Sequence, residues 1–380
     1  FGMDWSKEFN FILPLGISFY TFMLVGYILD VYWKRYRAET NYFKLALFSM
    51  YFPHIVQGPI GRYDRLSPQF NEPHYFSLEN TEYGLQLMLW GFFKKIVIAD
   101  RIGVVADKVF LHPYDYNGIF VIVGVLAYCL QLYADFSGGM DVVSGAAELY
   151  GIKLDKNFRQ PFFSKSISEF WRRWHITLGT WMKDYVFYPF SLSKKMMKFS
   201  KFMKKHLGTF AGKTLPICLA DLLIFFLVGV WHGAAWNFVA WGLYYGVILI
   251  IEKYLLSPVL DRLPDVVRHI YSIVLVVIGW VLFFSSSFGQ AADYIRVMFG
   301  AGAHGFADRE SMYLLTSNLI LWLILIFGST PLVHFRYEHM LRTKKWNTTI
   351  INSVVYAALF IVCIAYLVTE TYNPFLYFRF

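Results

Sequence analysis

One histidine of this chain lies inside a run that is apolar enough to cross a membrane. The run extends from Leu222 to Phe238, and the histidine is His232. An ionisable side chain at such a place is costly unless it faces the protein interior or a watery cavity, where it commonly carries function. A neutral imidazole can take a proton from a hydroxyl group near neutral pH. We therefore predict that His232 is a general base; the alternative is a histidine that ties two helices together.

The residues around His232 are small or aromatic. Gly229 and Gly233 allow the close approach of another backbone or of a substrate. Trp231 and Trp236 are placed to frame a cavity, and the amide of Asn237 can both donate and accept hydrogen bonds. We predict that the two tryptophans and the asparagine contact substrate.

A second histidine, His175, lies in the aromatic and basic segment Ser166–Tyr185. Its periodicity predicts one helix on which Trp171, Trp174 and His175 share a face. Ser166 or Ser168 is placed to cap the start of that helix, and Glu169, three positions after Ser166, would complete a capping box with it. His175 is therefore the second predicted catalytic residue, and Trp171 and Trp174 are predicted substrate contacts.

Cations of the same segment are available to an anionic ligand. Arg172, Arg173 and Lys183 can bind a phosphate or a pantetheine-linked nucleotide. They fit equally well as anchors at the membrane surface. Arg172 is the one that we include among the predicted substrate contacts.

Two carboxylates, Asp135 and Asp141, are expected at membrane depth. Asp135 is a further predicted substrate contact, although both carboxylates can instead pair with arginines that hold the core together. The sequence contains no HExxH pair and no carboxylate-rich cluster, so we expect no metal.

The composition is that of a membrane protein. Of the 380 residues only 16% are charged and 57% are hydrophobic, whereas roughly 25% of residues are charged in soluble proteins. We predict an all-α, polytopic membrane protein. Apolar runs near the length of a membrane-spanning helix lie at Phe11–Tyr32, Gly118–Tyr133, Leu215–Val230, Trp236–Ile251, Tyr271–Phe284, Leu314–Leu332 and Ile350–Val368.

The net charge of +9 is spread between the apolar runs, which excludes a nucleic-acid partner and favours a topological role. The basic clusters Lys34–Arg37, Lys194–Lys213 and Arg336–Lys345 are predicted to be cytoplasmic. Counting spans from the second cluster places Ser285–Met312 outside.

Three segments are too polar for lipid and too apolar for a solvated loop: Tyr51–Tyr63, Gln131–Gly145 and Pro161–Phe190. Such backbone must be buried by protein or line a cavity, so we expect re-entrant or horizontal helices around a central tunnel. Lys194–Lys205 is predicted to be an amphipathic helix on the cytoplasmic leaflet. We treat residues 1–380 as one membrane domain and expect further spans to precede Phe1.

Two motifs together resemble those of the membrane-bound O-acyltransferase (MBOAT) family. They are Phe170–Leu178 (FWRRWHITL) and Trp231–Asn237 (WHGAAWN). Phe52–Ile60, Tyr133–Gly138 and Asn373–Phe380 are similar to the alginate O-acetylase-like bacterial branch of that family.

The resemblance implies a helical ring around a tunnel, with His232 as the catalytic residue and His175 close by. It implies a thioester donor, acetyl-CoA, that enters from the cytoplasm, and no bound cofactor. It further implies a bacterial cytoplasmic membrane, a cell-surface polysaccharide as acceptor and an SGNH-hydrolase-like extracytoplasmic partner.

The predicted function is therefore transfer of acetyl from acetyl-CoA to a hydroxyl of a polysaccharide or of a partner protein. One alternative is the D-alanyl transfer of teichoic-acid modification, whose donor is a carrier protein. The other is a transporter in which the histidines relay protons or bind substrate.

Overall fold

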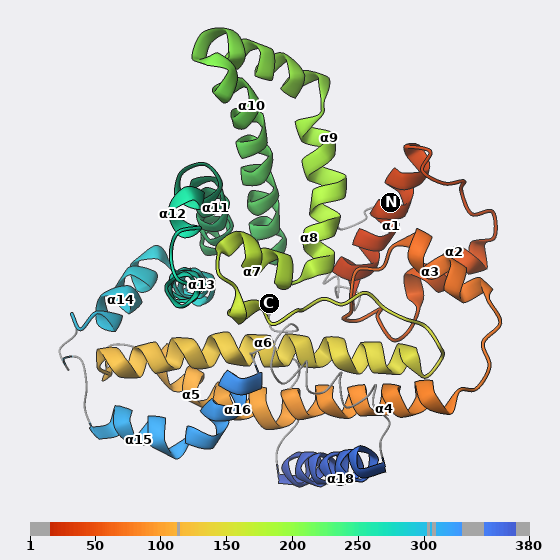
Figure 1. Ribbon diagram of the computed structural model, residues 1–380, viewed down its shortest axis with the longest axis vertical. Helices are drawn as coiled ribbons and strands as arrows, with labels where there is room; N and C mark the ends of the chain where they lie inside the picture. The colour runs from red at the N-terminus through yellow and green to blue at the C-terminus, as the bar shows by residue number, and fades with distance from the viewer. Residues whose placement is uncertain (1–15, 112–114, 302–304, 306–308, 329–345, 370–380) are drawn as a thin grey trace, which may run out of the picture.

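A computed structural model describes residues 16–111, 115–301, 305, 309–328 and 346–369, and within these ranges every regular element is a helix (Figure 1). The α-helices are α1 (Ile17–Tyr32), α2 (Tyr42–Met50), α3 (Tyr63–Asn71), α4 (Leu78–Phe92), α5 (Asp100–Leu111), α6 (Gly118–Glu148), α7 (Ile167–Arg173), α8 (Ile176–Met182), α9 (Tyr188–Ser191), α10 (Lys194–His232), α11 (Trp236–Ile251), α12 (Ser257–Leu260), α13 (Asp265–Phe284), α14 (Phe288–Met298), α15 (Arg309–Ser317), α16 (Leu319–Gly328) and α18 (Trp346–Thr369). The other helical turns are the π-helical η1 (Phe93–Ala99), η4 (Lys183–Phe187) and η5 (Glu252–Leu256) and the 3₁₀ turn η3 (Pro161–Phe163).

The predicted all-α, polytopic membrane architecture is confirmed. Among the described residues, 5 helices are long and apolar enough to cross a membrane: Gly118–Glu148, Lys194–His232, Trp236–Leu260, Asp265–Phe284 and Ile350–Val368. The predicted span Phe11–Tyr32 appears as the shorter helix α1, and its first residues lie outside the described part. The predicted span Leu314–Leu332 is divided between α15 and α16, and its last residues are likewise outside.

Helix α6 corrects one of the two alternatives predicted for Gln131–Gly145, the re-entrant segment, and leaves the horizontal helix untested. The helix continues without interruption from Gly118 to Glu148. Its apolar window is 72% buried inside the protein, so polar side chains such as Gln131 and Asp135 face other helices and not lipid. A continuous helix satisfies its own backbone groups, which removes the reason for a re-entrant turn.

The sequence reading missed the long helical unit formed by α4, η1 and α5, which packs along α6 (Figure 1). Small residues allow the close packing. A Cβ atom at Gly84 would meet the carbonyl oxygen of Gly145, and one at Gly91 would meet that of Gly138. Glycines on both helices therefore let the two backbones touch, as is common in membrane helix pairs.

The segment Pro161–Phe190, for which re-entrant or horizontal helices were predicted, consists of short helical pieces. Figure 1 shows α8 and α9 rising beside the second part of α10. The two parts of α10 are separated by a kink at Gly208, which has a φ of 87°. The first part carries the lysines of Lys194–Lys205 and crosses the top of the view in Figure 1. This segment is helical, and its position on a membrane leaflet stays a prediction.

Candidate functional site

A cavity of about 1310 Å³ lies between α6, α7, α8, α10, α11 and α13. Both predicted catalytic histidines contribute to its wall. The predicted site residues that line it are His175, His232, Trp171, Arg172, Trp174, Trp231 and Asp135. Segments that are far apart in the sequence thus meet around one space.

Two of the predicted substrate contacts are not among the residues that line this cavity. The side chain of Trp236 is 76% exposed at the start of α11. The amide Nδ2 of Asn237 donates a hydrogen bond to the carbonyl oxygen of Phe283, 3.1 Å away. Asn237 therefore ties α11 to the end of α13, beside the cavity wall.

The segment around His175 is not the single helix predicted for Ser166–Tyr185. Helix α7 ends at Arg173, Trp174 is extended, and His175 has a left-handed backbone with φ 45° and ψ 52°. Positive φ is uncommon for a residue other than glycine and persists only where the surrounding structure enforces it. The break changes the direction of the chain, and the rings of Trp174 and His175 still reach the same cavity.

Neighbouring segments hold this break in place. The backbone N–H of Ile176 donates to the carbonyl oxygen of Asn157, 3.0 Å away, and the Thr177 hydroxyl donates to Asn157 Oδ1 at 2.9 Å. The N–H of Ile60 donates in turn to Thr177 Oγ1 at 3.0 Å. Asn157 is buried, and the sequence reading missed it because a lone asparagine in a loop carries no distinctive spacing.

The His232 ring, at the last residue of α10, lies among aromatic rings. The centroids of Trp241 and Phe283 are each 5.1 Å from that of His232, in edge-on contact. Trp231 lies between the two histidines, with its ring centroid 4.7 Å from that of His232 and 6.2 Å from that of His175. Burial and the nearby His232 ring lower the pKa of His175 to about 3, so the His175 ring is neutral near neutral pH.

The start of α7 is held by a serine hydroxyl and a carboxylate. The Ser166 hydroxyl accepts a hydrogen bond from the N–H of Glu169 at 3.0 Å, so Ser166 is the cap and the alternative, Ser168, is not. The buried carboxylate of Glu252 accepts from the N–H groups of Ile167 at 2.6 Å and Ser168 at 2.9 Å. Negative charge at a helix N-terminus satisfies exposed N–H groups and complements the helix dipole.

Many of the charged residues that line the cavity are cations. The acidic residues there are Asp135, Glu169 and Asp221, and the cations are Arg159, Lys165, Arg172, Arg173, Lys183 and Lys253. Arg173 pairs with Glu169 at 2.6 Å, and Lys165 pairs with Asp265 at 2.6 Å. Within the described ranges, the guanidinium groups of Arg159 and Arg172 take part in no hydrogen bond or ion pair. Positive charge is therefore free to meet an anionic ligand.

Comparison with known proteins identifies the family. The model of the MBOAT, membrane-bound O-acyltransferase family matches residues 36–288. The chain belongs to this family. The predicted family and the predicted class of enzyme, an O-acyltransferase, are thus confirmed.

Three relatives of this MBOAT chain have names that mention different acceptors. The probable alginate O-acetylase AlgI of Pseudomonas putida is 33% identical, over 100% of this chain and 78% of that protein. The peptidoglycan O-acetyltransferase of Helicobacter pylori is 30% identical, over 79% of this chain and 60% of that protein. The teichoic acid D-alanyltransferase of Bacillus subtilis is 31% identical, over 63% of this chain and 59% of that protein. The aligned regions thus span from 59% to 78% of the length of these relatives.

The carboxylates of α6 in this MBOAT chain pair with lysines, where the sequence reading considered arginines. The Lys95 ammonium lies 2.8 Å from Asp135 and 2.8 Å from Asp100, and all three groups are largely buried. Lys94, the neighbour of Lys95 on η1, pairs with Asp141, which lies on α6 like Asp135. These pairs join η1 to α6, so Asp135 both lines the cavity and holds two helices together.

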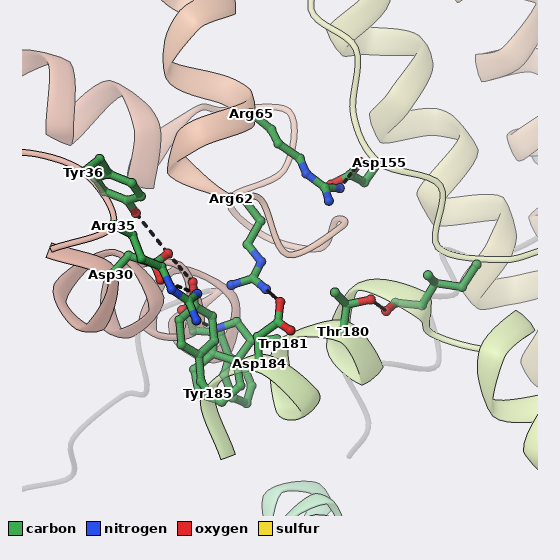
Figure 2. A network of polar contacts seen from close by, with 12 residues as sticks. Asp30, Arg35, Tyr36, Arg62, Arg65, Asp155, Thr180, Trp181, Asp184 and Tyr185 are labelled. Atoms are coloured by element: carbon green, nitrogen blue, oxygen red, sulfur yellow. Dashed lines mark hydrogen bonds and ion pairs between the residues drawn. The ribbon is translucent and has the colours of Figure 1, made fainter. Parts of the chain in front are cut away.

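A polar network fixes the N-terminal helices of the MBOAT chain to η4 (Figure 2). The buried carboxylate of Asp30 on α1 accepts hydrogen bonds from Arg35, Tyr36 and Tyr185. Figure 2 also shows Arg62 directed at Asp184, with which it forms an ion pair. The network holds the residues that follow Lys183, which is one of the cations of the cavity.

Helix α3 is tied to the segment that carries Asn157. Arg65 donates two hydrogen bonds to Asp155, at 2.9 and 2.8 Å (Figure 2). The side-chain amide of Gln69 accepts from the N–H of Lys153 at 2.8 Å and donates to its carbonyl oxygen at 3.2 Å. The support of His175 therefore begins at α3 and passes through this segment to Asn157.

Proposed function

We propose that this chain transfers an acetyl group from acetyl-CoA to a hydroxyl group on the outer side of a bacterial cytoplasmic membrane. The acceptor is a cell-surface polysaccharide or a serine of an SGNH-hydrolase-like partner protein. The observation that carries the proposal is that His175 and His232 share one cavity whose charged residues are mainly cations. Family membership supports the reaction class.

His232 is the general base. The acceptor oxygen attacks the carbonyl carbon of the thioester while its proton passes to the His232 ring. The tetrahedral intermediate then collapses, the carbon–sulfur bond breaks, and the proton moves from His232 to the departing sulfur. CoA leaves as a thiol, and the acceptor leaves as an acetyl ester.

The cations of the cavity support acetyl-CoA as the donor, because the nucleotide end of this molecule carries several phosphate charges. Arg172 and Arg159 are available for these charges, since neither forms an ion pair within the described part of the chain. Charge-assisted hydrogen bonds from arginine are well suited to phosphate oxygens. Trp171, Trp174 and Trp231 supply apolar walls for the pantetheine and the acyl group.

Polysaccharide hydroxyls are the acceptors that the relatives favour, since alginate and peptidoglycan appear in the names of proteins at 33% and 30% identity. A second candidate is transfer of D-alanine, because a teichoic acid D-alanyltransferase is 31% identical over 63% of the chain. The two functions differ in their donor, which makes them separable with purified protein.

The test is acyl transfer by purified protein in proteoliposomes, with acetyl-CoA and a D-alanyl carrier protein offered separately. We expect thioester consumption with acetyl-CoA, and a loss of roughly 10²–10⁴-fold in turnover in His232→Ala. His206→Ala is the matched control, because His206 is exposed on the basic part of α10 and does not line the cavity.

Near-wild-type transfer by His232→Ala would remove the proposal, and consumption of the D-alanyl carrier alone would favour the second candidate. Transport without thioester consumption would favour a transporter.

A further inference from the structure

The side chain of Asn157 is buried beside His175 at the break between α7 and α8. Its Oδ1 atom lies within hydrogen-bond distance of three groups. These are the Thr177 N–H at 3.1 Å, the Thr177 hydroxyl at 2.9 Å and the His175 Nδ1 at 3.2 Å. Its Nδ2 faces the sulfur of Met140 at 3.3 Å.

These contacts fix which end of the Asn157 amide faces His175. The backbone N–H of Thr177 can only donate, so the atom 3.1 Å from it must be the carbonyl oxygen of the amide. A carbonyl oxygen can only accept. The Nδ1 atom of His175, which shares this oxygen, must therefore carry the proton.

The opposite nitrogen of the ring is left without a partner. His175 Nε2 is buried and has no hydrogen-bond partner among the described residues, although the ring lines the cavity. A buried polar atom without a partner is costly and uncommon in native structures. A ligand in the cavity can supply the missing donor.

We propose that Asn157 is a positioning residue that holds His175 as the Nδ1–H tautomer and leaves Nε2 as a hydrogen-bond acceptor for a substrate group. The inference rests on the proposed acyltransferase function. A neutral ring in this tautomer cannot donate from Nε2, so it does not stabilise a tetrahedral oxyanion. It instead orients a donor, either the hydroxyl of the acceptor or an amide N–H of the pantetheine arm.

The tautomer can be measured without any enzyme assay. Protein labelled with isotopes in its histidines, in lipid bilayers, is compared with His175→Gln by solid-state NMR to identify the His175 signals. We expect a neutral ring protonated at Nδ1 in the wild type and a gain of the Nε2–H form in Asn157→Leu. A wild-type ring protonated at Nε2, or an unchanged ring in Asn157→Leu, would overturn the inference. If the tautomer is as expected and no acyl transfer occurs, only the proposed function fails.

A second variant covers the case in which Asn157→Leu does not fold. In Asn157→Asp a carboxylate takes the place of the amide oxygen, so the Nδ1–H tautomer is retained while the protonated ring is stabilised. The loss of kcat/KM on the acid side should move to higher pH by about one to three units. The other titratable or charged groups of the cavity wall are left unchanged. They are Asp135 on α6, which pairs with Lys95; Arg159 and Lys165, which precede α7; Glu169, Arg172 and Arg173 on α7; Lys183 on η4; Asp221 and His232 on α10; and Lys253 on η5.

Thr177→Val is the matched structural control. It removes a hydrogen bond to Asn157 Oδ1 and the acceptor of the Ile60 N–H, but leaves the Asn157–His175 contact. We expect Thr177→Val to lower Tm without moving the acid side of the kcat/KM profile. An acid side that stays in place in Asn157→Asp, or that moves equally in Thr177→Val, would overturn the assignment.

Discussion

At the scale of single residues, the two histidines that face the cavity are held in place by their neighbours, some of which line the cavity and one of which, Asn157, does not. Asn157 holds the left-handed backbone of His175. The ring of Trp231 contacts the rings of both His175 and His232 and so helps to set the distance between the two imidazoles. The ring of His232 is confined by Trp241 and by its neighbours on α13. The position of the His232 ring is therefore set mainly by its packing against aromatic rings.

Arg172 gives a prediction at this scale. Arg172→Gln removes a positive charge that lines the cavity without breaking an ion pair in the described part of the protein. If the guanidinium binds a donor phosphate, the loss of a charge-assisted hydrogen bond of about 1.5–3 kcal/mol raises KM for acetyl-CoA by roughly ten-fold or more. Steady-state kinetics of thioester consumption measures the change, with kcat affected less than KM.

The control for Arg172→Gln is Arg296→Gln. Arg296 has a 75% exposed side chain on α14 and lies outside the cavity, so the same change of charge should leave KM unaltered. An equal KM for acetyl-CoA in both variants would contradict the proposed role of Arg172.

The sequence could predict the residues whose type is unusual for their surroundings. A histidine in an apolar run and the aromatic FWRRWH segment stand out, and His232, His175, Trp171 and Trp174 do line one cavity. Asn157 could not be predicted in this way. Asn157 matters because it supports the left-handed backbone of His175, and the sequence has no periodicity that predicts this turn.

At the scale of elements, short helices need partners for the polar groups at their ends. Helix α7 has only 7 residues, too few to be stable alone. Its first N–H groups are satisfied by the Ser166 hydroxyl and by the Glu252 carboxylate, which comes from a π-helical turn after α11. The turn η5 therefore positions the helix that carries Trp171 and Arg172.

Glu252→Gln tests this support. The amide keeps one oxygen as an acceptor but loses the charge that complements the N-terminus of α7. We expect a loss of about 1–2 kcal/mol of stability, seen as a lower Tm of the detergent-solubilised protein. Asp261→Asn is the control, because its side chain is 69% exposed and its nearest cation contact is 3.8 Å long. A Tm for Glu252→Gln equal to that of the control would show that α7 does not depend on this charge.

The elements that the sequence mispredicted share one physical cause. Hydropathy measures transfer into lipid, whereas much of η1 and of the second half of α6 is buried by other helices, and α4 approaches α6 through its two buried glycines. Lys95 and Asp135 interrupt the apolar pattern, yet they neutralise each other where α6 and η1 meet. Buried ion pairs, and the close approach of Gly84 and Gly145, depend on residues that are far apart in the sequence. A hydropathy pattern read along one segment therefore cannot predict them.

At the scale of the whole molecule, the proposed reaction requires access to the cavity from both sides of the membrane. A donor from the cytoplasm and an acceptor outside must both reach the cavity that holds His175 and His232. The basic first part of α10 is the strongest indication of orientation, because lysines and arginines near membrane spans are retained in the cytoplasm. All six of its lysines between Lys194 and Lys205 are exposed.

The orientation leads to a labelling prediction. Three candidate spans, Lys194–His232, Trp236–Leu260 and Asp265–Phe284, separate the basic part of α10 from α14. An odd number of crossings puts the two on opposite sides of the membrane. With Cys129, Cys218 and Cys363 replaced by alanine, Lys201→Cys should react with a membrane-impermeant maleimide only in inverted vesicles. Ala292→Cys, exposed on α14, should react only in right-side-out vesicles. Labelling of both positions from one side would contradict the crossing count, and with it the route from a cytoplasmic thioester to an outer hydroxyl.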